Sequence, residues 1–206
     1  MNKYRKIIFP TYIYQYSLRE KNQVLKELLL PKILQYQKDH QIDKPAGWIT
    51  DKVYTTFEQD NINYKMFIQP SEVRQNYEKH FSQVFGKGTE FQFTTAWFNY
   101  YENGEYQEEH DHIGMSFNEP DAHFSAIHFL QFDPERHVPV TFIDSLSKLN
   151  RRYNNFYVYN PQIREGDLII FPAHLGHRVR PSQPTPDYPR ITVAFNLHIR
   201  STIHAN

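Results

Sequence analysis

The chain has 206 residues, which suits one domain or one domain with a helical extension. Its 23 basic and 23 acidic residues cancel, so no overall field recruits nucleic acid or an anionic membrane. No apolar run approaches the roughly 20 residues that span a bilayer. The absence of cysteine excludes disulfides, thiolate metal sites and cysteine nucleophiles, and it is compatible with the cytoplasm, where we expect the protein.

The first part of the chain has helical patterns. Ser17 and Glu20 have the spacing of a capping box, in which each side chain bonds the backbone amide of the other residue. Apolar residues then recur at helical spacing from residue 24 to about residue 36. Pro31 lies inside this run, which predicts a kink or two shorter helices. A second helix is expected over 71–85, with glycine directly after it as a stop signal.

After Gly88 the pattern changes to that of strands. The segment 90–101 (EFQFTTAWFNYY) is rich in aromatic and β-branched residues, as strands are. Further strands are expected at 124–132, 138–143, 156–159, 167–171 and 190–199. Short strands separated by turns suggest a sandwich or a barrel. The segment 181–189 (PSQPTPDYP) predicts an extended, exposed loop before the last strand.

Three histidines are candidates for metal ligands. Residues i and i+2 of a strand project from the same face, so His110 and His112 are expected to point together and Asp111 away. His177, far downstream, can complete a triangular set of ligands that one strand cannot supply. Among eleven histidines a single H-x-H pair is more often a surface or core feature, and only the wider context favours a metal site.

Arg190 and Thr192 are candidates for an anion pocket. They share one face of the last predicted strand, so both can hold one carboxylate, the arginine with two parallel hydrogen bonds. Taken alone, a rim arginine beside an ordinary strand threonine is the better interpretation. Combined with the three histidines, the carboxylate pocket is favoured.

Five segments carry a resemblance to a known family. They are 47–48 (GW), 97–99 (WFN) with Gly104, 110–112 (HDH), 125–130 (SAIHFL), and 166–172 (GDLIIFP) leading to His177, Arg190 and 195–196 (FN). In this order they resemble the Fe(II)/2-oxoglutarate-dependent oxygenases, within them the small bacterial and phage group related to prolyl hydroxylases. The resemblance spans roughly residues 45–199. It implies an α+β, mainly β fold in one domain (1–206): helices in 1–88 supporting a double-stranded β-helix, or jelly roll, in 89–200.

The resemblance also assigns the metal ligands. His110 and His177 match the family's two histidine ligands, and His112 stands where most members have an aspartate. The implied site is therefore a set of three histidines, and the neutral imidazole leaves the ferrous centre one charge unit more positive. Imidazole suits several divalent metals, so zinc and manganese stay open as alternatives.

The same resemblance assigns the cosubstrate pocket. Arg190 matches the arginine that pairs with the distal carboxylate of 2-oxoglutarate, and Thr192 matches the hydroxyl that assists it. His128 stands where relatives place a tyrosine that touches this carboxylate, with core packing as an equal alternative. Asn99 is assigned to the lining of the pocket, and a buried structural asparagine is equally credible.

The implied activity is that of a dioxygenase that uses Fe(II), 2-oxoglutarate and O₂. It would hydroxylate a C–H bond of a peptidyl-prolyl or small-molecule substrate and release succinate and CO₂. The alternatives are a cupin-like three-histidine dioxygenase without 2-oxoglutarate and a non-catalytic metal-binding or sensing module. No membrane partner is expected, and the basic aromatic stretch 151–157 is interpreted as a turn more readily than as a nucleic-acid contact. The insertion 113–124 is expected near the active site, and His137 is expected to face solvent.

Overall fold

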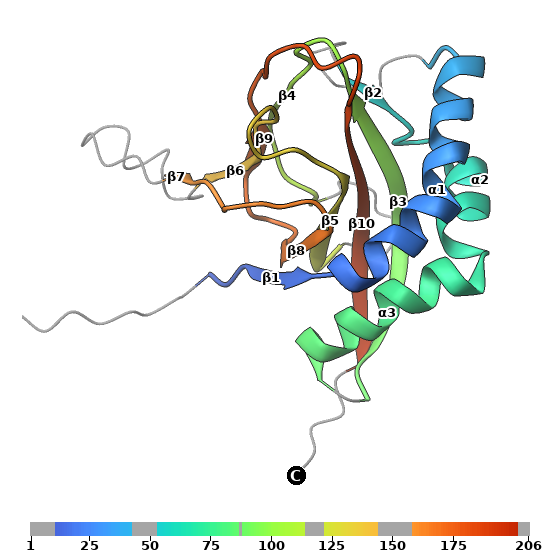
Figure 1. The fold of residues 1–206 in the computed structure, drawn as a ribbon. Helices are drawn as coiled ribbons and strands as arrows, with labels where there is room; N and C mark the ends of the chain where they lie inside the picture. The colour runs from blue at the N-terminus through green and yellow to red at the C-terminus, as the bar shows by residue number, and fades with distance from the viewer. Residues whose placement is uncertain (1–10, 43–52, 87, 114–121, 144–157, 202–206) are drawn as a thin grey trace, which may run out of the picture.

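The computed structural model of the protein describes residues 11–42, 53–86, 88–113, 122–143 and 158–201. Figure 1 shows the described chain as two β-sheets with helices on one side. The strands are β1 (Tyr14–Ser17), β2 (Tyr54–Thr55), β3 (Glu90–Tyr101), β4 (Gln107–His110), β5 (Phe124–Gln131), β6 (Val140–Ile143), β7 (Val158–Tyr159), β8 (Asp167–Pro172), β9 (His177–Val179) and β10 (Arg190–Ser201). The helices are α1 (Arg19–Asp39), α2 (Asp60–Asn63), the π-helix η1 (Tyr64–Ile68) and α3 (Ser71–Phe85).

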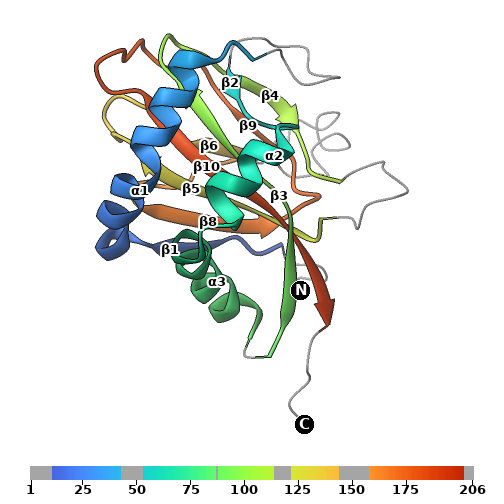
Figure 2. The same cartoon turned by 90° about the vertical axis from the view of Figure 1, so that its right-hand side faces the viewer.

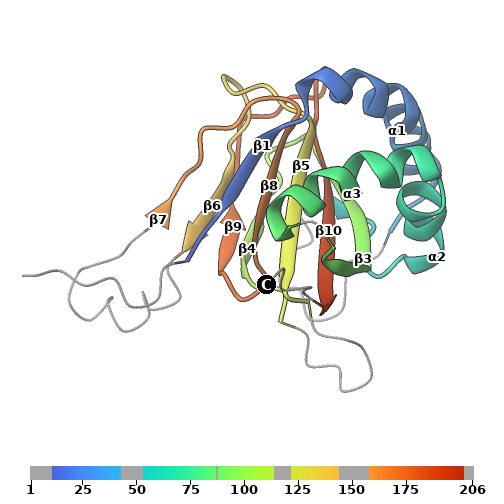
Figure 3. The ribbon, with the colours of Figure 1, turned by 90° about the horizontal axis from the view of Figure 1, so that it is seen from below.

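The strands form two antiparallel sheets. The larger sheet has the order β1-β8-β5-β10-β3-β2, and the smaller has the order β4-β9-β6-β7. Seen from below, the small sheet, the large sheet and the helices form three successive layers (Figure 3). This arrangement is a double-stranded β-helix, or jelly roll, in a mainly β fold with supporting helices, and it confirms the expected fold class.

The helices cover the outer face of the large sheet, as Figure 2 shows. The helical side contributes Leu25, Leu29, Ile33, Val73, Tyr77 and Phe81 to one apolar cluster, in which all six are buried. Their four-residue spacings place these side chains on one stripe of each helix. No helix in the described part of the chain combines the length and apolar character that crossing a membrane requires.

The start of α1 differs from the expected capping box. Ser17 is the last residue of β1, and the helix begins at Arg19 after Leu18, without a side-chain cap. Leu18 is instead fixed by a backbone hydrogen bond from its amide to the carbonyl of Gly166, 2.7 Å away. Pro31 lies inside one continuous helix, and Figure 1 shows that this helix changes direction along its length, as a proline predicts.

Alternation along the long strands divides the interior in two. On β10, Ile191, Val193 and Phe195 belong to the cluster beneath the helices. Arg190 and Thr192 point the other way and line a cavity between the sheets. A second apolar cluster lies in that space, with Phe129, Phe132, Val140, Phe142, Ile163, Ile169, Phe171 and Leu175. The central strand β10 thus packs into the core with one face and lines the cavity with the other.

Candidate metal centre

The structure brings His110, His112 and His177 together. His110 ends β4 and lies directly opposite His177 in the neighbouring strand β9. One ring nitrogen from each of the three lies within 4.8 Å of the others. His110 and His112 point to the same site, as predicted, but not from the face of one strand, because β4 ends at His110. His112 reaches the site from the next loop, where its amide donates to the carbonyl of Ala173 at 2.8 Å.

Backbone carbonyls set the protonation of two of these rings. His110 Nδ1 lies 2.7 Å from the carbonyl of Glu108, and His177 Nδ1 lies 3.0 Å from that of Leu175. A carbonyl only accepts hydrogen bonds, so each Nδ1 carries the proton and each Nε2 keeps its lone pair. His112 Nε2 and His177 Nε2 lie 3.2 Å apart. Without a metal, His112 Nε2 can donate a hydrogen bond to His177 Nε2, and with a metal both nitrogens can turn their lone pairs to the ion.

The site keeps these imidazoles neutral. Burial lowers the pKa of His112 to about 3, with a smaller contribution from His110. Burial also places the pKa of His177 well below its ordinary value and lowers that of His110. Aromatic rings surround the group: Phe171 lies 4.9 Å from the His177 ring and Trp97 lies 5.5 Å from the His112 ring. Neutral imidazoles can bind a metal near pH 7 without first losing a proton.

A cavity of about 160 Å³ adjoins the three histidines. Arg190 lines it and is only 2% exposed. Its guanidinium lies 4.6 Å from the centroid of the Tyr101 ring and 5.6 Å from that of Phe129. Its Nε and Nη1 have no hydrogen-bond partner, and no described residue forms a salt bridge with it. A buried cation with unpartnered donors is a binding site for a carboxylate.

Thr192 and Asn99 line the same cavity, as the sequence predicts. The two residues lie opposite each other on β10 and β3, and both are buried. Asn99 Oδ1 has no hydrogen-bond partner, so the amide is available to a ligand. The sequence analysis missed Tyr101, whose hydroxyl donates to Gln107 Oε1 beside Arg190. Its two-residue spacing from Asn99 was the available signal.

His128 does not join this group. Its strand partners include Val193 and Leu168, which belong to the cluster beneath the helices. Accordingly its Nδ1 lies 2.8 Å from the hydroxyl of Tyr77 on α3, and it is fully buried. The neighbouring Ile127 lines the cavity instead. The structure therefore places His128 on the opposite face of the sheet from the assignment made on the sequence.

Three other expectations from the sequence concern Asp111, the stretch 151–157 and the insertion 113–124. Asp111 was expected to point away from the metal site, whereas it is an exposed residue of the cavity lining, and its carboxylate accepts from the amide of Ile113 at 3.1 Å. The stretch 151–157 and most of the insertion 113–124 lie outside the described residues.

Comparison with known proteins relates this site to a family. Residues 95–196, which include all three histidines and Arg190, match a family model described as "Putative 2OG-Fe(II) oxygenase". This segment belongs to the 2OG-Fe(II) oxygenases. As a member of this family, the protein is an oxidoreductase. The family uses iron and 2-oxoglutarate, and the three histidines form a group that could hold the iron. No curated protein is similar enough in sequence to be matched with the chain.

Solved structures share the fold of this oxygenase at low identity. A prolyl-4-hydroxylase from Pseudomonas putida has a TM-score of 0.56 at 13% identity, covering 92% of this chain and 93% of its own. A viral collagen prolyl hydroxylase from Paramecium bursaria Chlorella virus-1 has a TM-score of 0.55 at 13% identity, covering 90% and 95%. The alpha ketoglutarate dependent epimerase SnoN from nogalamycin biosynthesis has a TM-score of 0.61 at 13% identity, covering 94% and 82%. Identities this low support the jelly roll and leave the substrate open.

Proposed function

We propose that this oxygenase is a dioxygenase that hydroxylates a C–H bond of a peptidyl-prolyl or small-molecule substrate, with 2-oxoglutarate as cosubstrate. One observation carries the proposal: three neutral imidazoles converge at a cavity that is also lined by Arg190, whose buried Nε and Nη1 have no hydrogen-bond partner. This donor set fits a divalent metal next to a carboxylate. Two of the solved structures of the same fold are named as prolyl hydroxylases, which supports the substrate class by analogy.

In this proposal His110, His112 and His177 hold the iron through Nε2. When bound, iron and 2-oxoglutarate supply the oxidising power, in a reaction that consumes O₂ and yields succinate and CO₂. The carbonyls of Glu108 and Leu175 fix the ligating face of two rings.

Arg190 binds the distal carboxylate of the cosubstrate and sets its orientation, assisted by the hydroxyl of Thr192 and the amide of Asn99. The charges agree with this role, because a guanidinium and a divalent cation among neutral imidazoles call for a dianion. The aromatic rings of Trp97 and Phe171 keep water from the rings that they touch.

The buried arginine also separates the proposal from its alternatives. A cupin-like dioxygenase without 2-oxoglutarate has no need of a guanidinium buried beside the metal. A non-catalytic metal-binding module would hold the metal but would not turn over the cosubstrate.

The experiment is an anaerobic titration of the Fe(II)-loaded protein with 2-oxoglutarate, followed by the visible charge-transfer band of a chelated 2-oxo acid. We expect a saturable band that is lost in Arg190→Ala and kept in Arg180→Ala, a matched control at an exposed arginine. Iron binding without a band would reject the cosubstrate. Succinate release and the gain of one oxygen atom by a proline-containing peptide, measured by mass spectrometry, then test the reaction and the substrate class.

We further propose that the helical part, 1–88, and the jelly roll, 89–200, act as a single domain. The support is that β1 pairs with β8 inside the large sheet and that residues of α1 and α3 share one apolar cluster with β10.

A further inference from the structure

Arg190 occupies a weakly anchored position in the backbone. It is the first residue of β10 and follows the proline-rich segment 181–189. On one side it pairs with Tyr101 of β3, but on the other side the pairing with β5 begins only at Ile191 and is irregular there. Strand pairing therefore holds Arg190 on one side only. Its position must also depend on how the end of the preceding loop is attached.

Two buried side chains hold the carbonyls of the two residues directly before Arg190. Gln131 Nε2 donates to the carbonyl of Pro189 at 2.8 Å. His137 Nε2 lies 2.9 Å from the carbonyl of Tyr188, and the amide of Asp133 donates to His137 Nδ1 at 2.9 Å. Because Nδ1 accepts, the proton is on Nε2, which donates to the Tyr188 carbonyl.

Both side chains are removed from solvent. His137 is 4% exposed and Gln131 is 6% exposed, so the expectation that His137 faces solvent is wrong. A buried hydrogen bond to a carbonyl fixes the backbone more firmly than an exposed one, because its loss leaves a polar group without a partner.

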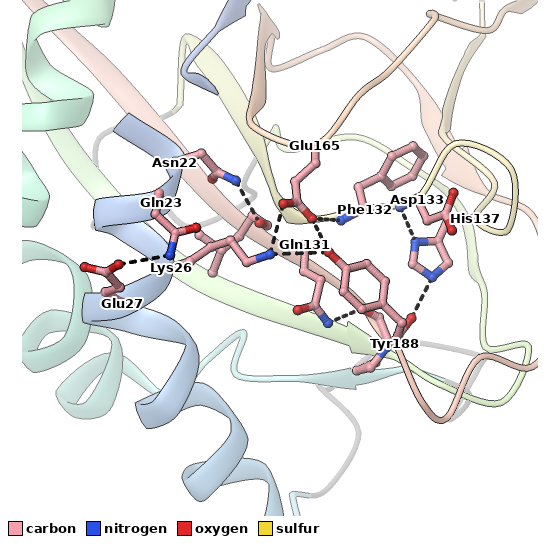
Figure 4. A network of polar contacts seen from close by, with 12 residues as sticks. Asn22, Gln23, Lys26, Glu27, Gln131, Phe132, Asp133, His137, Glu165 and Tyr188 are labelled. Carbon is pink, nitrogen blue, oxygen red and sulfur yellow. Dashed lines mark hydrogen bonds and ion pairs between the residues drawn. The ribbon is translucent and has the colours of Figure 1, made fainter. Parts of the chain in front are cut away.

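The side chain of Tyr188 provides a further attachment, drawn in Figure 4. Its hydroxyl donates to Glu165 Oε2, and Lys26 Nζ of α1 lies 2.9 Å from Glu165 Oε1 and 3.3 Å from the Tyr188 hydroxyl. The amide of Phe132 donates to the same Glu165 carboxylate at 3.1 Å. The loop end is thus tied both to the end of β5 and to the helical layer.

We propose that His137 and Gln131 are positioning residues for Arg190. Neither lines the cavity, and each acts through the backbone by holding one of the two carbonyls that precede the arginine, so that its guanidinium faces the cosubstrate cavity. The inference rests on the proposed role of Arg190 in binding 2-oxoglutarate. An exposed ion pair, Arg136–Asp187, joins the same two segments without touching these carbonyls, and surface pairs of this kind contribute little.

The test is calorimetric titration of 2-oxoglutarate into metal-loaded protein without oxygen, together with a separate titration of the metal. We expect His137→Leu and Gln131→Leu each to weaken 2-oxoglutarate binding by about ten-fold, because a buried carbonyl loses its donor, while metal affinity stays as in the wild type. His137→Gln, which keeps an amide donor near the position of Nε2, should recover most of the binding. Asp187→Asn breaks the exposed ion pair and should change neither affinity.

Wild-type affinity for 2-oxoglutarate in both leucine variants would overturn the proposal. A parallel loss of metal and 2-oxoglutarate binding would also overturn it, because that pattern marks a general structural role. If His137→Leu does not fold, Gln131→Leu and His137→Gln still decide. Arg190→Ala separates the two levels: if it binds 2-oxoglutarate normally, the proposed function fails, whereas if it loses binding and the leucine variants do not, only the positioning role fails.

Discussion

Replacing Arg190 with methionine should stabilise the ligand-free protein while abolishing its response to 2-oxoglutarate. The guanidinium is almost fully buried, and its Nε and Nη1 lack partners. Contacts with the Tyr101 and Phe129 rings return about 1–2 kcal/mol. Removing an ion from water costs several kcal/mol, which exceeds that return.

The expected gain in the free energy of unfolding follows from the difference between these two energies. Water can enter the cavity beside the guanidinium, which makes the cost of burying it smaller. Methionine has a similar length and no charge, and apolar replacements of buried ionic groups stabilise proteins by about 1–4 kcal/mol. We expect a gain of about 1–3 kcal/mol in the free energy of unfolding. For a chain of this size, each kcal/mol raises the melting temperature by about 2–4 °C.

Thermal unfolding of the metal-loaded protein with and without 2-oxoglutarate measures both effects. The wild type should gain about 2.7 kcal/mol when the ligand concentration is one hundred times its dissociation constant, whereas Arg190→Met should gain nothing. Arg180→Met, at an exposed position, should behave as the wild type in both conditions. A ligand-free Arg190→Met that melts below the wild type would show that the arginine stabilises the fold, and the reasoning would be refuted.

Three further predictions concern other parts of the structure. His177→Ala should weaken metal binding by more than the roughly 10–100-fold cost of losing a group that only orients a ligand, and wild-type affinity in an anaerobic metal titration would contradict the ligand assignment. Tyr77→Phe should lower the free energy of unfolding by about 1–3 kcal/mol, because His128 Nδ1 loses its partner; an unchanged urea midpoint would speak against that contact. Burial lowers the pKa of His128 to about 3 from 6.5, so the unfolded chain binds the extra proton and stability falls as the pH drops from about 6.5 towards 3. His128→Asn should remove up to about 1.4 kcal/mol per pH unit from that slope, and equal slopes in the two proteins would exclude this cause.

The elements that the sequence predicts best are long and regular. The helix α3 has the predicted bounds 71–85, and β3 has the predicted bounds 90–101, because each carries a sustained periodicity. The strands β1, β2 and β9 have two to four residues, which is too few for a pattern. The Ser17–Glu20 pattern was misleading because β1 pairs with β8, a contact 150 residues away in sequence that no local rule contains.

The site shows the same division between local and distant information. The family resemblance assigned His110, His177 and Arg190 to one site, and all three line the same cavity. The position of His128 was not predictable, because the face that it occupies depends on the register between β5 and β10, and a shift of one residue moves a side chain to the other face. The burial of His137 depends likewise on the path of the segment 181–189, which folds back over it.

The order of strands in the two sheets determines which strand edges are open to pairing with another copy of this protein. The outermost strands, β1 and β2 in one sheet and β4 and β7 in the other, have two to four residues, and the 12-residue strand β10 is flanked on both sides. The strand β2 pairs with only Asn99 and Tyr100 of β3. Open backbone amides and carbonyls along a long outer strand invite pairing with another chain. Because β1 covers the free side of β8, removing residues 14–17 would uncover a six-residue strand, DLIIFP, in which every residue after Asp167 is apolar. A shortened protein of that kind should exchange strands between copies or aggregate, even with its metal centre intact.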